Sequence, residues 1–223
     1  MSVWEGPVRD APADVPVLRS ATVFEGGIWD VRTDRIAFAG QTVDRDVMVH
    51  PGAVGVVALD ESDQILLVRQ YRHPVGQFLF EPPAGLLDHL DEDPLAAAKR
   101  ELLEEAGFEA ERWAVLVDFL NTPGGSSETF RCFLARGLRP APQGRRHTGE
   151  AEEVDLPVAW VDLDRARDLV LGGDMQNPTT VVGVLAAWSS RQTGWSTLRP
   201  ADCAWPVRDR MVATDRVRRP RGS

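Results

Sequence analysis

The fold is decided by one stretch of the chain, which reads Gly85-Leu-Leu-Asp-His-Leu-Asp-Glu92-Asp-Pro94-Leu-Ala-Ala-Ala-Lys-Arg100-Glu101-Leu-Leu-Glu104-Glu105-Ala-Gly107-Phe108. Its second half predicts a helix. Asp93 can cap the first turn, and Pro94 suits that turn because the amide hydrogen that it lacks would have no partner there. Leucines and alanines recur at helical spacing, and Gly107 suits the left-handed residue that ends many helices.

Three carboxylates, Glu101, Glu104 and Glu105, lie three and four residues apart on this helix and therefore share neighbouring surface. Like charges at this spacing destabilise an isolated helix by about 0.2–0.5 kcal/mol per pair. Arg100, four residues before Glu104, can neutralise one carboxylate, and a hard divalent cation such as Mg²⁺ can neutralise more. The alternative is a solvated acidic helix face, which leaves the glycines of the stretch unexplained.

The stretch resembles the Nudix box, the signature of the Nudix hydrolase superfamily. The residues that match in register are Glu92, Arg100, Glu101, Leu102, Glu104, Glu105, Gly107 and Phe108. Six residues rather than five separate Gly85 from Glu92, so the loop of the box is one residue longer than in the family pattern. The flanking residues 69–74 and 80–88 are similar to the ADP-ribose pyrophosphatase branch of the superfamily.

The resemblance implies an α/β fold, a Nudix α/β/α sandwich with a mixed β-sheet and an additional N-terminal region of antiparallel strands. We expect a flexible lead-in at residues 1–16, N-terminal strands at 17–50, the Nudix hydrolase domain at 51–192 and an irregular tail at 193–223. In the ADP-ribose pyrophosphatase branch the N-terminal strands pair between two subunits, which implies a homodimer here.

The residue pattern by itself predicts most of the secondary structure. Alternating apolar and polar residues at 28–36 indicate a strand, and the apolar run at 53–59 is typical of a strand covered on both faces. We expect further strands at residues 22–25, 41–50, 65–71, 78–80, 113–120, 130–135 and 156–161, and further helices at 163–170 and 178–191.

The resemblance and the chemistry of the carboxylates together indicate a metal site. Glu101 and Glu105 are the expected Mg²⁺ ligands, and Glu104 is expected either to bind the metal or to support those ligands. In the family a backbone carbonyl just before the box glycine also holds the metal, and Ala84 has that place here. Mn²⁺ is the alternative cation, and Arg100 is expected to orient the carboxylates.

Five residues outside the helix are candidates for binding the substrate. Arg69 and Arg72 could each bind a diphosphate as a planar fork, with a surface salt bridge as the alternative. By resemblance Glu81 contacts the nucleoside or ribose end, with an idle rim carboxylate as the alternative. Trp29 could stack on an adenine or pack in the core, and Glu128 matches a glutamate of the branch in a loop that faces the substrate.

A polar loop at residues 138–153 is the expected source of the catalytic base. In the family a mobile acidic loop at this place supplies the base, which would be Glu152 or Glu153 here. The residues leave the choice between these two glutamates open, and without the resemblance the run would be interpreted as a solvated loop.

Composition narrows the class of protein further. The 223 residues, 43% of them hydrophobic, suit one globular domain, and a net charge of −9 argues against a general binder of nucleic acid or anionic membranes. Two cysteines give no disulfide framework and favour a reducing cytoplasm. No apolar run suits a signal peptide or a membrane span, and the arginines of the last residues alternate with aspartates rather than forming a basic arm.

The resemblance of the box and its flanking residues implies an Mg²⁺-dependent hydrolase that cleaves the diphosphate of ADP-ribose to AMP and ribose 5-phosphate. One alternative is hydrolysis of another nucleoside diphosphate derivative, such as a sugar nucleotide, NADH or a dinucleoside polyphosphate. A second alternative is a module that binds ADP-ribose without cleaving it, but the intact carboxylates of the helix favour an enzyme.

Overall fold

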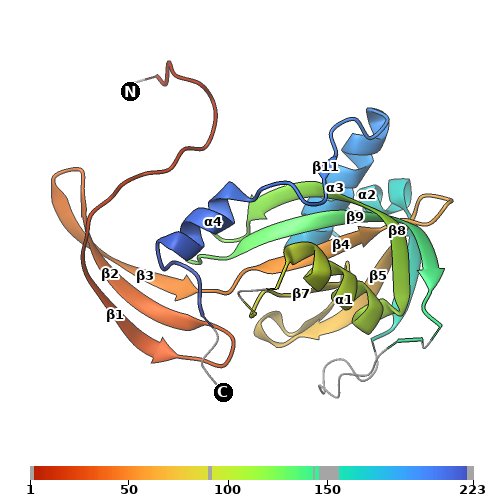
Figure 1. Cartoon of the computed structure of the whole chain (residues 1–223), viewed down its shortest axis with the longest axis horizontal. Coiled ribbons are helices and arrows are strands. Elements are labelled where there is room, and N and C mark those ends of the chain that lie inside the picture. The colour runs from red at the N-terminus through yellow and green to blue at the C-terminus, as the bar shows by residue number, and fades with distance from the viewer. Residues whose placement is uncertain (1–2, 90–91, 143, 146–155, 220–223) are drawn as a thin grey trace.

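An arm of three strands extends from a larger body in the computed structural model, which describes residues 3–89, 92–142, 144–145 and 156–219 (Figure 1). The body contains two β-sheets with helices on both sides. The elements in chain order are β1 (Val17–Glu25), β2 (Asp30–Phe38), β3 (Gln41–Val49), β4 (Ala53–Ala58), β5 (Gln64–Arg72), the 3-10 helix η1 (His73–Val75), β6 (Gln77–Glu81), β7 (Ala84–Leu86), α1 (Pro94–Ala106), β8 (Phe108–Leu120), β9 (Thr129–Pro140), β10 (Val158–Asp162), α2 (Leu163–Leu171), α3 (Pro178–Gln192), β11 (Arg199–Pro200) and α4 (Pro206–Ala213).

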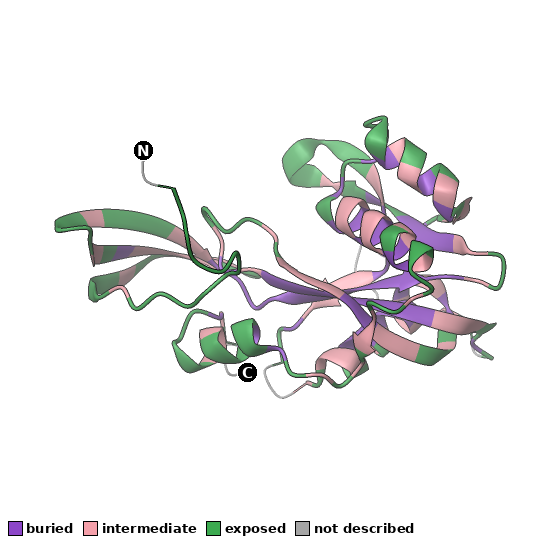
Figure 2. Ribbon diagram, turned by 90° about the horizontal axis from the view of Figure 1, so that it is seen from above, coloured by how far each residue is buried: buried purple, intermediate pink, exposed green. Residues whose placement is uncertain are grey.

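The arm is an antiparallel sheet in the order β1-β2-β3. Its register pairs Glu25 with Asp30 and Asp30 with Val49, so the turn between β1 and β2 lies at the end of the arm that joins the body. Most of its residues are exposed or half-buried (Figure 2). The N-terminal strands expected from the sequence are confirmed.

The larger sheet of the body has the order β11-β8-β9-β4-β7 and is mixed, because β4 and β9 run parallel while the other neighbours run antiparallel. The smaller sheet is antiparallel in the order β10-β5-β6. The mixed sheet predicted for the Nudix fold is therefore confirmed.

The core lies on both faces of the central strands. In β4, Val56 belongs to an apolar cluster with Ala98 and Leu102 of α1, whereas the next residue, Val57, belongs to a cluster with residues of α2 and α3. Successive strand residues point to opposite faces, so a strand covered by helices on both sides must be apolar throughout. This arrangement confirms the predicted α/β/α sandwich.

The C-terminal tail differs from the prediction. Residues 193–223 were expected to be irregular, but β11 pairs with β8 and α4 follows at Pro206–Ala213. The physical reason is Trp205, which is 4% exposed, joins the apolar cluster of α1 and lies under the guanidinium of Arg131 at 4.7 Å. Burying an aromatic ring of this size fixes the segment to the body. The expected division of the chain into four segments otherwise stays a prediction.

A single finding bears on membranes. Within residues 3–89, 92–142, 144–145 and 156–219, no helix is long and apolar enough to cross a membrane.

Candidate active site

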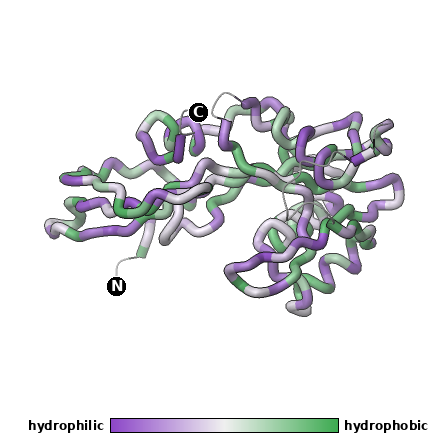
Figure 3. Tube along the Cα trace, turned by 90° about the horizontal axis from the view of Figure 1, so that it is seen from below, coloured by the Kyte–Doolittle hydropathy of each residue, from purple (hydrophilic) through white to green (hydrophobic). Residues whose placement is uncertain are grey.

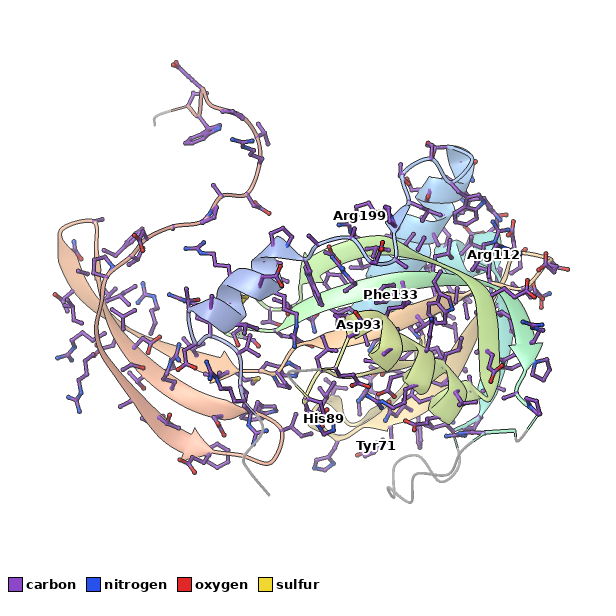
Figure 4. The ribbon with its side chains drawn as sticks, in the orientation of Figure 1. Tyr71, His89, Asp93, Arg112, Phe133 and Arg199 are labelled. Carbon is purple, nitrogen blue, oxygen red and sulfur yellow. The ribbon has the colours of Figure 1, made fainter. Side chains whose placement is uncertain are left out.

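Helix α1 starts and ends where the sequence predicts. The Asp93 carboxylate accepts hydrogen bonds from the amides of Leu95 and Ala96 at 3.0 Å each, and Figure 4 labels Asp93 at the start of the helix. Gly107 ends the helix with a φ of 74°, a left-handed conformation that glycine adopts without strain. These caps fix which face of α1 turns towards the strands, and therefore where its carboxylates lie.

The carboxylates of α1 are turned inwards rather than solvated. Glu101 and Glu105 are only 7% and 4% exposed, and Glu104 is half-buried. Burying a carboxylate is unfavourable unless a partner compensates its charge. A solvated acidic face would leave these side chains exposed, so the structure contradicts that alternative for Glu101 and Glu105.

Gly85 makes the inward position of Glu101 possible. A Cβ atom at residue 85 would lie 1.9 Å from Glu101 Oε1 and 2.1 Å from the carboxyl carbon. Only glycine leaves this space free, so the glycine of the box and the first glutamate of the helix are parts of one arrangement. The extra residue of the loop between Gly85 and Glu92 does not separate these two parts.

Arg100 compensates the charge of the cluster. Its Nε and Nη2 each donate to Glu92 at 3.1 Å, and its Nη1 lies 2.6 Å from Glu101 Oε1 and 3.1 Å from Glu104 Oε2. The hydrogen bonds to Glu92, followed by the nearby Glu101 charge, raise the pKa of Arg100 above its ordinary value, although burial opposes the shift. The sequence predicted the contact with Glu104 but not the one with Glu101.

The second buried glutamate is held by the backbone of β7. The amide of Ala84 donates to Glu105 Oε2 at 2.8 Å. This hydrogen bond brings the Glu105 carboxylate to β7, the strand whose Ala84 carbonyl is the expected metal ligand. The structure thus brings Ala84, Glu101 and Glu105 together between β7 and α1, and Glu104, the fourth predicted metal-binding residue, joins them through Arg100.

The chemistry of these donors fits a hard divalent cation, which prefers carboxylate and carbonyl oxygens. One observation supports the fit: a single guanidinium nitrogen of Arg100 lies within hydrogen-bonding distance of Glu101 and Glu104, so both carboxylates converge on a point that positive charge occupies. Among the described residues, no three side chains of His, Cys, Asp or Glu are already grouped as a complete metal site.

The predicted substrate residues Arg72 and Glu81 bind each other. Arg72 Nε donates to Glu81 Oε1 at 2.9 Å and Nη2 lies 2.5 Å from Glu81 Oε2, a bidentate pair across β5 and β6. Glu81 is 3% exposed, and only Pro82 and Pro83 separate it from Ala84. Arg69 lies on the same strand as Arg72, with its guanidinium 4.3 Å from the centre of the Phe78 ring.

Glu128 lies in a network that the sequence did not predict. Its carboxylate accepts a hydrogen bond from Asn121 Nδ2 at 2.9 Å, and its charge acts on the buried His50. Burial lowers the pKa of His50 below its ordinary value, and Glu128 opposes that effect. His50 Nδ1 accepts the amide hydrogen of Gly52 at 3.0 Å. The sequence around His50, a single histidine before Pro51, does not indicate that this side chain is buried.

The remaining predicted residues lie away from the helix. Trp29 is in the turn between β1 and β2, 36% exposed, with its ring 6.2 Å from that of Phe24. It is therefore not a core residue of the body. Glu152 and Glu153, the two candidates for the catalytic base, lie outside the described residues.

Sequence reasoning also missed Arg145, which joins the end of α1 to Leu156, two residues before β10. Its Nε donates to the carbonyl of Glu104 at 3.1 Å, and its Nη1 donates to the carbonyl of Leu156 at 3.2 Å. A positive side chain at the C-terminal end of a helix is favourable because the last carbonyls lack partners within the helix.

The inward-facing carboxylates of α1, packed against Gly85 of β7, fit a hydrolase that acts on phosphorus-containing anhydrides. The NUDIX domain family matches residues 49–179, and the chain belongs to this family. Nudix hydrolases generally need divalent metal ions.

Comparisons with known proteins agree with this assignment. The chain is 40% identical over 210 residues to the ADP-ribose pyrophosphatase of Mycobacterium tuberculosis, which covers 94% of this chain and 100% of that protein. It is 33% identical to a methanol dehydrogenase activator of Bacillus methanolicus over 75% of this chain and 89% of that protein. A solved structure described as an ADP compounds hydrolase has the same fold, with a TM-score of 0.70 and 23% identity over 83% of this chain and 99% of that one.

Proposed function

We propose that the protein hydrolyses the diphosphate of ADP-ribose to AMP and ribose 5-phosphate with Mg²⁺. The observation that carries the proposal is the pair of buried carboxylates, Glu101 and Glu105, held against Gly85 and the Ala84 amide. The 40% identity to the mycobacterial ADP-ribose pyrophosphatase supports ADP-ribose as the substrate.

The proposed metal ligands are Glu101, Glu105 and the carbonyl of Ala84, with Glu104 as a further ligand or a support. A bound Mg²⁺ supplies positive charge against the diphosphate oxygens, and Mn²⁺ is the alternative cation. Arg100 keeps Glu101 and Glu104 oriented through its bidentate pair with Glu92. A guanidinium fixed on one side in this way can hold two carboxylates on the other.

The proposed reaction adds water across the P–O–P link. One oxygen–phosphorus bond forms, the bridging bond breaks, and the phosphate that leaves carries the bridging oxygen. Glu152 or Glu153 would take the proton of the attacking water. Arg69 and Arg72 would bind the diphosphate, and Glu81 would orient Arg72 while it contacts the ribose end.

The nucleoside end of the substrate is assigned to a second copy of the chain. We propose a homodimer through the arm, in which Trp29 stacks on the adenine of the partner's substrate and Glu128 lines the same side of the site. Seven large apolar residues of residues 17–38 are exposed, which is unusual for a sheet that stays alone: Val17, Leu18, Val23, Phe24, Ile28, Trp29 and Phe38. Figure 3 shows hydrophobic segments along the arm.

A cytoplasmic location is part of the proposal. Cys132 and Cys203 are both free thiols, and burial raises the pKa of Cys132 to about 12. Free thiols fit a reducing compartment.

The test is hydrolysis of a panel that contains ADP-ribose, ADP-glucose, NADH and diadenosine polyphosphates with Mg²⁺, with the products separated by chromatography. The proposal expects ADP-ribose to be preferred and AMP to form. Preference for another diphosphate would overturn ADP-ribose as the substrate but would still support hydrolysis of a diphosphate. Tight ADP-ribose binding without cleavage would show that the protein is a binding module and not an enzyme.

A further inference from the structure

The C-terminal segment contacts the place where the arm meets the body. We call residues 26–30 and 50–52 the junction, because the turn between β1 and β2 lies there beside the end of β3. Residues 205–219 lie next to it, and α4 runs between the arm and the body (Figure 1). We call residues 205–219 the clasp.

Arg218 binds three parts of the junction. Its Nη2 donates to the carbonyl of Gly26 at 3.0 Å, its Nε lies 3.5 Å from Asp30 Oδ2, and its amide donates to the carbonyl of His50 at 3.3 Å. The side chains of Arg218 and Asp30 are only 11% and 21% exposed, so solvent screens this ion pair less than a pair on the open surface. The neighbouring Val217 is buried and anchors the segment.

Arg208 also binds the junction. Its Nη1 donates to the carbonyl of Pro51 at 2.7 Å, and the residue is 7% exposed. A Cβ atom at Gly52 would lie 2.4 Å from the same nitrogen, so glycine is needed for this approach. Gly52 has a φ of 88°, and its carbonyl accepts a hydrogen bond from the Leu87 amide at 3.0 Å. This bond links the junction to the end of β7.

The start of the clasp is fixed to the body. Arg131, which is 2% exposed, lies 4.7 Å from the centre of the Trp205 ring and donates to the carbonyls of Cys203 and Ala204, just before the clasp, at 2.9 and 3.1 Å. Arg131 also pairs with Asp118 at 2.8 Å. The clasp therefore forms a continuous connection from a rigid strand of the body, β9, to the turn that holds Trp29.

We propose that the clasp positions the Trp29 turn for substrate binding, and that Arg218 is the positioning residue that acts on it. The inference rests on the proposed function for the role of Trp29, and it adds that the C-terminal segment sets the affinity for the nucleoside. Arg218 touches no reacting group. Its contacts with Gly26 and Asp30 lie on either side of Trp29 and fix the two ends of the turn.

The test compares Arg218→Ala with Arg219→Ala. Arg219 carries the same charge one residue later, but its side chain is 62% exposed and pairs only with the exposed Asp215 among the contacts described. For Arg218→Ala we expect the KM for ADP-ribose to rise about five- to tenfold, the size of one typical lost intramolecular hydrogen bond, with kcat unchanged. Arg219→Ala is expected to leave both constants unchanged.

A double-mutant cycle with Trp29→Ala tests the route of the effect. If Arg218 acts through the turn, Arg218→Ala adds little to the KM once Trp29 is absent, because the two changes remove the same contact. Independent, multiplicative effects on the KM would overturn the positioning role, as would an equal KM for Arg218→Ala and the wild-type enzyme.

Amide hydrogen exchange of residues 24–34 tests the clasp without relying on activity. Faster exchange in Arg218→Ala than in Arg219→Ala is the expected result. Equal exchange in the two variants would overturn the clasp. If the wild-type protein did not hydrolyse ADP-ribose, the proposed function would fail, and the exchange result would still decide whether the clasp holds the turn.

Discussion

The box between β7 and α1 and the arm of β1–β3 differ in how completely their interactions are satisfied within one chain. In the box, each buried carboxylate has a partner a short distance away, such as Arg100 for Glu101 and the Ala84 amide for Glu105. In the arm, polar pairs such as Arg35 with Asp44 join the strands, whereas Phe24 and Phe38 are exposed. Within one chain the buried carboxylates of the box therefore have partners, whereas large apolar side chains of the arm stay exposed.

The largest effect is expected in the box. Glu101→Gln keeps the shape of the side chain but removes the charge of a proposed metal ligand, so we expect kcat to fall about a hundredfold or more. The amide oxygen of the new side chain can still accept from Arg100 Nη1, so the unfolding free energy should change by less than about 1.5 kcal/mol. The control is Glu109→Gln, on an exposed position of β8. A fully active Glu101→Gln enzyme would contradict the assignment of the metal ligands.

A second prediction tests how tightly the box is packed. In Gly85→Ala the new methyl group overlaps Glu101 Oε1, so the carboxylate must move. We expect a loss of about 1–3 kcal/mol of stability from the overpacking and a fall in activity of about tenfold or more. Gly27→Ala, where a Cβ atom meets nothing within 4 Å, is the control for thermal stability. Equal melting temperatures for the two variants would show that the box tolerates the overlap.

A third prediction concerns the exposed face of the arm. Val23 is 62% exposed on β1, and Val23→Asp would place a charge in the proposed dimer interface. We expect the dimer to weaken about tenfold or more, because an unpaired charge is costly to bury. The measurement is molar mass by light scattering across a dilution series. Val8→Asp, at a position 98% exposed in the lead-in, is the control, and a monomeric wild-type protein would refute the dimer.

The smallest expected effect lies at His50, in the junction between the arm and the body. Burial lowers its pKa, so the folded protein keeps His50 neutral while the unfolded chain takes up a proton below about pH 6.5. The contribution of neutral His50 to the unfolding free energy is complete above that pH and is lost as the pH falls. The unfolding free energy then falls by at most about 1.4 kcal/mol per pH unit.

Denaturant unfolding between pH 7 and pH 5 measures the effect of His50. In His50→Asn, the side-chain oxygen can accept the Gly52 amide but does not titrate, so this part of the pH dependence should disappear. His89→Asn, with a side chain 74% exposed, should keep the wild-type slope. If both variants kept the wild-type slope, His50 would not be the titrating group.

The same contrast explains what the sequence could predict. The caps of α1 and the two-sided burial of β4 depend on residue types at fixed local spacing, and these signals are strong. The helix α4 could not be predicted from its own residues, which alternate between arginines and other types. It is held in place because Trp205 packs against residues far away in the chain. The pairing of Arg72 with Glu81 depends on how the hairpin of β5 and β6 brings them together, which composition does not reveal.

The measurement that tests the central claim most directly is the stoichiometry of products from ADP-ribose as Mg²⁺ is added to metal-free protein. We predict that AMP and ribose 5-phosphate form in equal amounts, that the rate rises with Mg²⁺ until it saturates, and that EDTA abolishes it. Absence of both products at every concentration of Mg²⁺ and of Mn²⁺ would contradict the claim that the carboxylates of α1 form the active site of an ADP-ribose hydrolase.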